Sequence, residues 1–198
     1  GGGGFLDKTN LYHLEGVYNF KNQVKFVDLL VGANYRQYQL RSEGTLFADL
    51  KDGRDGTIPI NEYGAFVQAG KKLFGDHLKL SASLRYDKNQ NFEGQFTPRL
   101  SSVFSFGEHN FRLSYQTGFR IPTTQDQYID LQTPSARLLG GLAVVQDRYK
   151  LSGNSYTLQS VLAGKPAPYQ SKAWKPEQVR TLEFGYKGFL GDRMLADF

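Results

Sequence analysis

Histidine, cysteine and acidic residues supply most catalytic and metal-binding groups, and the chain has few of them in useful arrangements. Its 198 residues include three histidines, His13, His77 and His109, and no cysteine. No two histidines have a metal-ligand spacing such as i, i+4, and none lies where a serine nucleophile could use it as a base. The missing cysteines exclude disulfides, thiolate metal sites and thiol redox chemistry. We therefore expect no enzyme activity, no metal site and no cofactor.

One acidic stretch superficially resembles a calcium loop. Residues Asp49 to Gly56 read DLKDGRDG. The acids miss the alternate positions that an EF-hand loop uses, and Lys51 stands where a ligand would be needed. We interpret this stretch as a polar loop.

The charge of the chain points away from nucleic acid. The formal net charge is +5, from 24 Lys and Arg against 19 Asp and Glu. The basic residues are scattered instead of forming a basic stripe, so we expect no nucleic-acid partner.

Apolar and polar residues alternate along much of the chain, which predicts β-strands with one apolar and one polar face. In residues 78–87, leucines and Tyr86 occupy one face and charged or serine residues occupy the other. The expected strands are 11–20, 24–41, 62–74, 78–87, 97–106, 109–121 and 179–189, with residues 193–198 beginning an eighth.

The connections between these strands alternate in length. Tight turns are expected near Asn22, Gly75 to His77, Gly107 to His109 and Gly191 to Asp192, where hairpin residues cluster. Long polar loops are expected from Ser42 to about Ile60, Lys88 to about Gln95 and Pro122 to about Lys175. The pattern predicts an all-β, antiparallel up-and-down sheet with its long loops at one end. Transmembrane barrels of bacterial outer membranes have this asymmetry, with the long loops extracellular.

A soluble lipocalin-like barrel would show the same alternation with the apolar face inside. Three features favour a membrane barrel: strands longer than globular proteins usually have, a polar face with charges of both signs, and aromatic residues near strand ends. The polar face would then line a water-filled lumen, where we favour a network of ion pairs over attraction of an anionic ligand. The charged residues expected there are Arg36, Arg85, Arg99, Arg112, Arg120 and Glu183.

Several short sequence motifs also resemble those of a known protein family. The runs 96–104 (FTPRLSSVF), 110–122 (NFRLSYQTGFRIP) and 174–185 (WKPEQVRTLEFG) resemble, in this order, strands of the barrel of TonB-dependent outer-membrane receptors. The runs 32–38, 44–47 and 62–68 resemble the version common in Bacteroidetes-type bacteria. The resemblance covers nearly the whole chain.

The resemblance implies a function, a location and partners. Such receptors lie in the outer membrane of Gram-negative bacteria, bind a scarce nutrient at the cell surface and import it with energy from the TonB complex, which acts through a plug domain. Their barrels have about 22 strands. We expect residues 1–198 to be a partial barrel of about eight strands, with the plug domain and signal peptide outside this chain. Expected partners are outer-membrane lipid, the nutrient ligand and the TonB complex.

The resemblance also implies that outer loops bind the ligand, which directs attention to residues 122–175. A loop of this length is uncommon unless it is functional. Expected ligand contacts are Tyr128, Tyr149, Tyr156, Tyr169 and Trp174, although each is more simply explained by packing within the loop. The ligand classes considered are an iron chelate, cobalamin, a glycan and a peptide, and the sequence does not select among them.

Two other functions remain open. A small, complete outer-membrane barrel with a structural or adhesive role would account for the same strands. A soluble lipocalin-like binder would also do so, but it would be folded in water without detergent.

Overall fold

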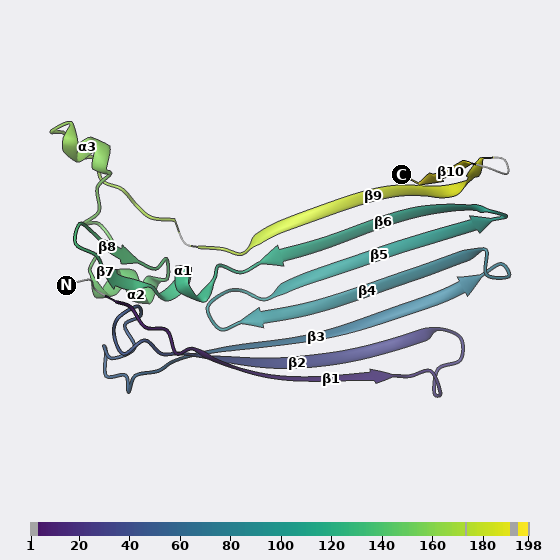
Figure 1. Ribbon diagram of the computed structural model, residues 1–198, viewed down its shortest axis with the longest axis horizontal. Helices are drawn as coiled ribbons and strands as arrows, with labels where there is room; N and C mark the ends of the chain where they lie inside the picture. The colour runs from purple at the N-terminus through teal and green to yellow at the C-terminus, as the bar shows by residue number, and fades with distance from the viewer. Residues whose placement is uncertain (1–3, 173, 191–193, 198) are drawn as a thin grey trace. The chain divides into compact units, whose positions relative to one another are not determined.

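The computed structural model describes residues 4–172, 174–190 and 194–197 (Figure 1). It divides into two compact units. The sheet unit comprises Tyr12–Gln37, Asn61–Arg120 and Glu177–Phe198, and the loop unit comprises Gly1–Leu11, Tyr38–Ile60 and Ile121–Pro176.

Eight strands form one sheet in the part of the chain that the structure describes, in the order β1-β2-β3-β4-β5-β6-β9-β10 (Figure 1). The strands are β1 (Asn10–Asn19), β2 (Asp28–Leu40), β3 (Ile58–Leu73), β4 (Leu78–Asn89), β5 (Gln95–Phe106), β6 (His109–Arg120), β9 (Glu177–Leu190) and β10 (Met194–Asp197). From β3 onward each successive pair is antiparallel. The predicted up-and-down topology is therefore confirmed, and the sheet is open, as expected of a partial barrel.

The strand register collects the apolar residues on one face, because residues directly opposite each other share a face. Leu80 pairs with Ser102, Ser102 with Leu113, and Leu113 with Phe184. We call the side that carries these residues the apolar face, and the opposite side the polar face. Leu113 is 50% exposed and Phe184 is 67% exposed. Large apolar side chains therefore cover an open surface, which suits contact with lipid.

Two connections differ from expectation. The loop expected from Lys88 to about Gln95 is present but shorter than expected, because β4 and β5 continue until only residues 90–94 separate them. This turn is compact: the Lys88 Nζ donates to the Phe92 carbonyl at 2.6 Å, and the Asn91 backbone N–H donates to the Asn89 side chain at 2.7 Å. Conversely, the turn near Asn22 is less tight than expected, since residues 20–27 connect β1 and β2.

The other turns follow the sequence pattern. Phe74, Gly75 and Asp76 all have positive φ in the turn after β3, and Gly107 has a φ of 57° in the turn after β5. The eighth strand is confirmed as β10, while the predicted turn at Gly191 and Asp192 lies outside the described residues.

The loop unit contains secondary structure that the sequence pattern did not predict. Its elements are α1 (Thr124–Tyr128), β7 (Asp130–Gln132), β8 (Arg137–Leu139), α2 (Ala143–Arg148) and α3 (Leu158–Leu162). The α1 helix begins with a capping box, in which the Thr123 hydroxyl accepts from the Asp126 backbone N–H and the Asp126 carboxylate accepts from the Thr123 N–H. Among the described residues, no helix has the length and hydropathy needed to cross a membrane.

A hydrophobic core holds the loop unit together. Its buried members are Leu40, Leu46, Phe47, Ile58, Ile60 and Tyr128. Phe47 forms an antiparallel bridge with Ile129, and the Asp130 backbone N–H donates to the Leu46 carbonyl at 2.9 Å. Residues 41–57 and 121–176 therefore fold together as one body instead of forming two independent loops.

Candidate ligand-binding loops and polar strand face

A cluster of charged residues surrounds Asp130 in the loop unit. The Asp130 side chain is fully buried. Arg137 Nε donates to its Oδ1 at 2.7 Å, while Arg148 Nη1 and Lys51 Nζ each donate to its Oδ2 at 3.2 Å. The Tyr149 hydroxyl lies 2.8 and 2.9 Å from the two carboxylate oxygens. We call these five residues the Asp130 cluster; they satisfy a buried carboxylate with donors from both parts of the loop unit.

The ring of Tyr149 lies among the cations of this cluster. The Arg137 guanidinium is 4.8 Å from the ring centroid, and Lys51 Nζ is 5.7 Å from it. Lys51 Nζ also donates to the Tyr149 hydroxyl at 3.0 Å. Cation–π attraction therefore adds to the hydrogen bonds that fix the orientation of Tyr149.

At Asp130 and Asp52, hydrogen-bonding partners oppose the effect of burial and lower the pKa of the carboxyl group. Burial raises the pKa of Asp130, but hydrogen bonds from Arg137, Tyr149 and Lys51 outweigh it and hold the pKa below the usual range of a carboxyl group. Asp52 forms an ion pair with Arg148, whose hydrogen bond lowers the pKa of Asp52. Lys51, Arg137 and Arg148 therefore contact two carboxylates, those of Asp130 and Asp52.

Asp49 holds the turn that begins the long connection between β2 and β3. Its Oδ2 accepts from the Ser42 backbone N–H at 2.7 Å, and its Oδ1 accepts from the Ser42 hydroxyl at 2.8 Å and from the Gly44 N–H at 2.9 Å. Burial raises the pKa of Asp49, but these donors lower it further than burial raises it. The buried carboxylate thus stabilises a loop, as the sequence interpretation of residues 49–56 requires.

The aromatic residues expected to contact ligand fall in different environments. Tyr128 is 5% exposed in the hydrophobic core, so we assign it to packing. Tyr156 and Tyr169 are about half exposed. Both lie near the ends of the segment around α3, where Tyr156 forms an antiparallel β-bridge with Pro168. The Trp174 indole lies against Gly141, where a Cβ atom would overlap the ring. The structure therefore places Tyr149 alone of the five in the Asp130 cluster.

The charged residues expected on the polar face do lie there. Arg85 donates to Asp87 and, at 2.7 Å, to the Asn34 side chain. Arg112 lies 3.8 Å from Glu183, and Arg120 lies 3.1 Å from Glu177. These contacts agree with a network of ion pairs.

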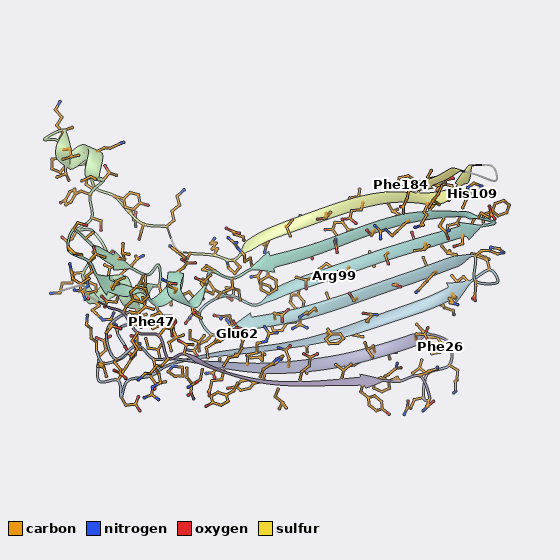
Figure 2. All side chains as sticks on the ribbon, viewed as in Figure 1. Phe26, Phe47, Glu62, Arg99, His109 and Phe184 are labelled. Carbon is orange, nitrogen blue, oxygen red and sulfur yellow. The ribbon has the colours of Figure 1, made fainter. Side chains whose placement is uncertain are left out.

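The two other arginines are placed by register. Arg99 lies opposite Ser83 on β4 and Gln116 on β6, near the middle of the sheet (Figure 2). Arg36 is two residues beyond Asn34 and so shares its face. That the polar face lines a lumen stays a prediction.

The histidines contact polar neighbours. His13 lies 3.6 Å from Glu15, His77 Nδ1 lies 2.9 Å from the Ser105 carbonyl, and His109 Nδ1 lies 2.7 Å from the Tyr186 hydroxyl. Within the described ranges, no three His, Asp or Glu side chains are arranged to hold a metal ion.

Comparison with known families decides the classification. The family model described as TonB dependent receptor-like, beta-barrel, matches residues 1–198. The chain belongs to this family. No curated protein sequence matches this receptor-barrel chain significantly.

Solved structures agree with this fold. The siderophore receptor PirA from Pseudomonas aeruginosa aligns with 93% of this receptor-barrel chain at 16% identity, with a TM-score of 0.60. The ferric enterobactin receptor PfeA (G324V mutant) from the same organism aligns with 92% at 12% identity and a TM-score of 0.58. PirA from Acinetobacter baumannii aligns with 92% at 14% identity and a TM-score of 0.56. The chain spans only 25 to 29% of the length of these receptors.

Sequence reasoning missed most of the Asp130 cluster. Lys51 and Asp130 are 79 positions apart, and no local pattern joins them. One signal was present: Asp130 interrupts the apolar run from Tyr128 to Leu131, and a charge inside such a run is usually buried with partners. Lys51, Arg137 and Arg148 carried no comparable signal.

Proposed function

We propose that the chain is part of an outer-membrane receptor that binds a nutrient at the cell surface and imports it into the periplasm with energy supplied through TonB. The observation that carries this proposal is the family match over residues 1–198. The exposed apolar face of the sheet supports it, because a barrel strand needs such a face against lipid.

The proposal includes features beyond the described residues. A plug domain elsewhere in the receptor would contact the TonB complex, and residues 1–198 would be one part of a larger barrel in a Gram-negative bacterium. The resemblance of residues 32–38, 44–47 and 62–68 supports a Bacteroidetes-type member.

The loop unit is our candidate for ligand contact. Tyr156, Tyr169 and Trp174 present exposed aromatic surface there, and the half-buried Tyr149 is held by its hydrogen bonds in the Asp130 cluster. An iron chelate, cobalamin, a glycan or a peptide would each be compatible. The names of the structural neighbours, siderophore and ferric enterobactin receptors, make iron-loaded siderophores the first ligands to test.

The first experiment concerns assembly. The receptor should run on unheated gels as a compact β-rich species only after folding in detergent or lipid, and should shift on heating. Folded, monodisperse protein in plain buffer would instead support a lipocalin-like binder.

The second experiment concerns binding and import. We would titrate the purified receptor with each ligand class and compare Tyr156→Ala and Tyr169→Ala with Tyr63→Ala, which removes an exposed tyrosine from β3 in the sheet unit. The loop variants should weaken binding and the control should not. Uptake in cells should stop without TonB while surface binding continues; uptake that continues without TonB would contradict the proposed energy source.

A further inference from the structure

A hollow of about 480 Å³ interrupts the apolar face of the sheet unit. Small side chains form part of it, and larger leucines and a tyrosine surround them. The lining includes Ala69, Gly70, Ala82, Ser102, Leu113 and Leu182. Its volume lies within the range of about 300 to 1,000 Å³ typical of small-molecule sites.

The register places this hollow at a definite depth along the strands. One row across the sheet pairs Ala69 with Ala82 and Ala82 with Leu100, and the next row pairs Lys71 with Leu80. The row after that, nearer the short turns, is rich in aromatic residues: Phe104 pairs with Phe111, and Phe111 with Tyr186. The hollow therefore begins just inside an aromatic row, which is where the hydrocarbon region of a membrane begins.

A lysine lies at the end of the hollow nearest the short turns. Lys71 is opposite Leu80, so its side chain is on the apolar face, and it lines the hollow. Its Nζ lies 5.9 Å from the centroid of the Phe26 ring. Lysines near the ends of membrane-spanning elements extend their ammonium groups to the interface, where lipid phosphates lie.

We propose that the hollow binds one glycerophospholipid of the periplasmic leaflet, with an acyl chain among the small side chains and the phosphate at Lys71. This inference rests on the proposed function, which turns the apolar face toward lipid and the short turns toward the periplasm. The charge of Lys71 complements a phosphate, and an unfilled hollow would lose contacts between lipid and protein. The site differs from general lipid contact in having a defined depth and a charged end.

The test uses the whole receptor, folded in micelles of an uncharged maltoside detergent that contain either phosphatidylglycerol or diacylglycerol as a minor component. Native mass spectrometry after release counts the molecules that remain bound. Ala82→Leu places a larger side chain inside the hollow, and Ala65→Leu adds the same volume to the same face outside it, since Ala65 pairs with Tyr86 and does not line the hollow. Lys71→Gln removes the charge, and Lys72→Gln removes the neighbouring charge that pairs with Asp76 at 2.9 Å.

We expect one retained phosphatidylglycerol and much less diacylglycerol. Lys71→Gln should lower phosphatidylglycerol retention about fivefold, as expected for one lysine near an anionic headgroup. Ala82→Leu should also lower retention severalfold, because the larger side chain obstructs the acyl chain, and both controls should match the unmodified receptor.

Equal retention in Ala82→Leu and Ala65→Leu would overturn the site, as would equal effects of Lys71→Gln and Lys72→Gln. Retention of diacylglycerol at the level of phosphatidylglycerol would overturn the role of the phosphate. Each variant is also checked for heat-modifiable mobility, so that failure to form a membrane barrel, which contradicts the proposed function, is distinguished from loss of the lipid alone.

Discussion

The sheet unit and the loop unit differ in where they place their large apolar side chains. In the sheet unit, leucines such as Leu100 and Leu182 are 56% and 72% exposed, and hydrogen bonds between strands hold the structure. In the loop unit, Phe47 and Ile60 are at most 2% exposed, and a buried carboxylate binds three cations. The loop unit is thus built like a small water-soluble domain, whereas the sheet unit needs an apolar solvent on one face.

This difference separates two properties of the receptor. Substitutions in the core of the loop unit should loosen the candidate ligand-binding region and leave membrane assembly intact. Substitutions on the apolar face of the sheet should do the reverse.

The largest effect is expected from Phe47→Ala. Removing this buried ring should lower the free energy of unfolding of the loop unit by about 4 kcal/mol, because it leaves a cavity in the core. Hydrogen exchange should speed up across residues 121–176 and stay unchanged in β4 to β6. Leu162→Ala, at a side chain 79% exposed, is the control; an equal effect there would contradict a shared core.

Asp130→Asn should lower the free energy of unfolding of the loop unit by about 3 kcal/mol. The change leaves Lys51, Arg137 and Arg148 close together without a buried negative charge. Limited proteolysis of residues 133–142 measures the loosening. Asp76→Asn breaks an exposed ion pair with Lys72 and should leave the cleavage rate unchanged. Slow cleavage in both variants would show that the Asp130 cluster does not stabilise the loop unit.

Leu113→Arg tests the sheet unit. An arginine on the apolar face should reduce the stability of the protein folded into vesicles by about 2 kcal/mol and lower the amount of the heat-modifiable species. Ser114→Arg, at the next position on the polar face, places the same charge beside Glu183 and should fold normally. Equal folding of both variants would contradict the assignment of the apolar face to lipid and of the polar face to water.

Lowering the pH should give the smallest effect, a loss of stability in the loop unit. The pKa of Asp130 is lower in the folded state than the ordinary value of 3.8, so its contribution to stability is complete above that value and is lost as the pH falls through the folded pKa. In residues 1–198, the fluorescence of the single tryptophan, Trp174, should change below about pH 4. The change should be smaller in Asp130→Asn, where Asp49 and Asp52, whose pKa values are also lowered, still titrate. An undiminished change in that variant would assign the transition to those other carboxyl groups.

The strands were predictable because their signal is local. Alternation within ten residues marks β4 and β6, and the observed register places the alternating residues as expected. The loop unit was less predictable because it depends on contacts between distant residues: the bridge between Phe47 and Ile129 and the ion pair between Lys51 and Asp130 leave no periodic pattern. The helix α1 had a readable start in the spacing of Thr123 and Asp126, but helices this short are set mainly by the packing around them.

The central claim is that the apolar face of the sheet contacts lipid while the polar face contacts water. Residues 1–198 contain no cysteine, so single-cysteine variants along β6, made in a receptor from which any other cysteine has been removed, can each carry one spin label. In the receptor reconstituted in lipid vesicles, labels from Phe111→Cys, Leu113→Cys and Tyr115→Cys should be accessible to oxygen, which concentrates in the bilayer. Labels from Arg112→Cys, Ser114→Cys and Gln116→Cys should be accessible to a water-soluble nickel chelate. Accessibility that alternates in the opposite sense, or does not alternate, would contradict the assignment of this chain to a membrane barrel.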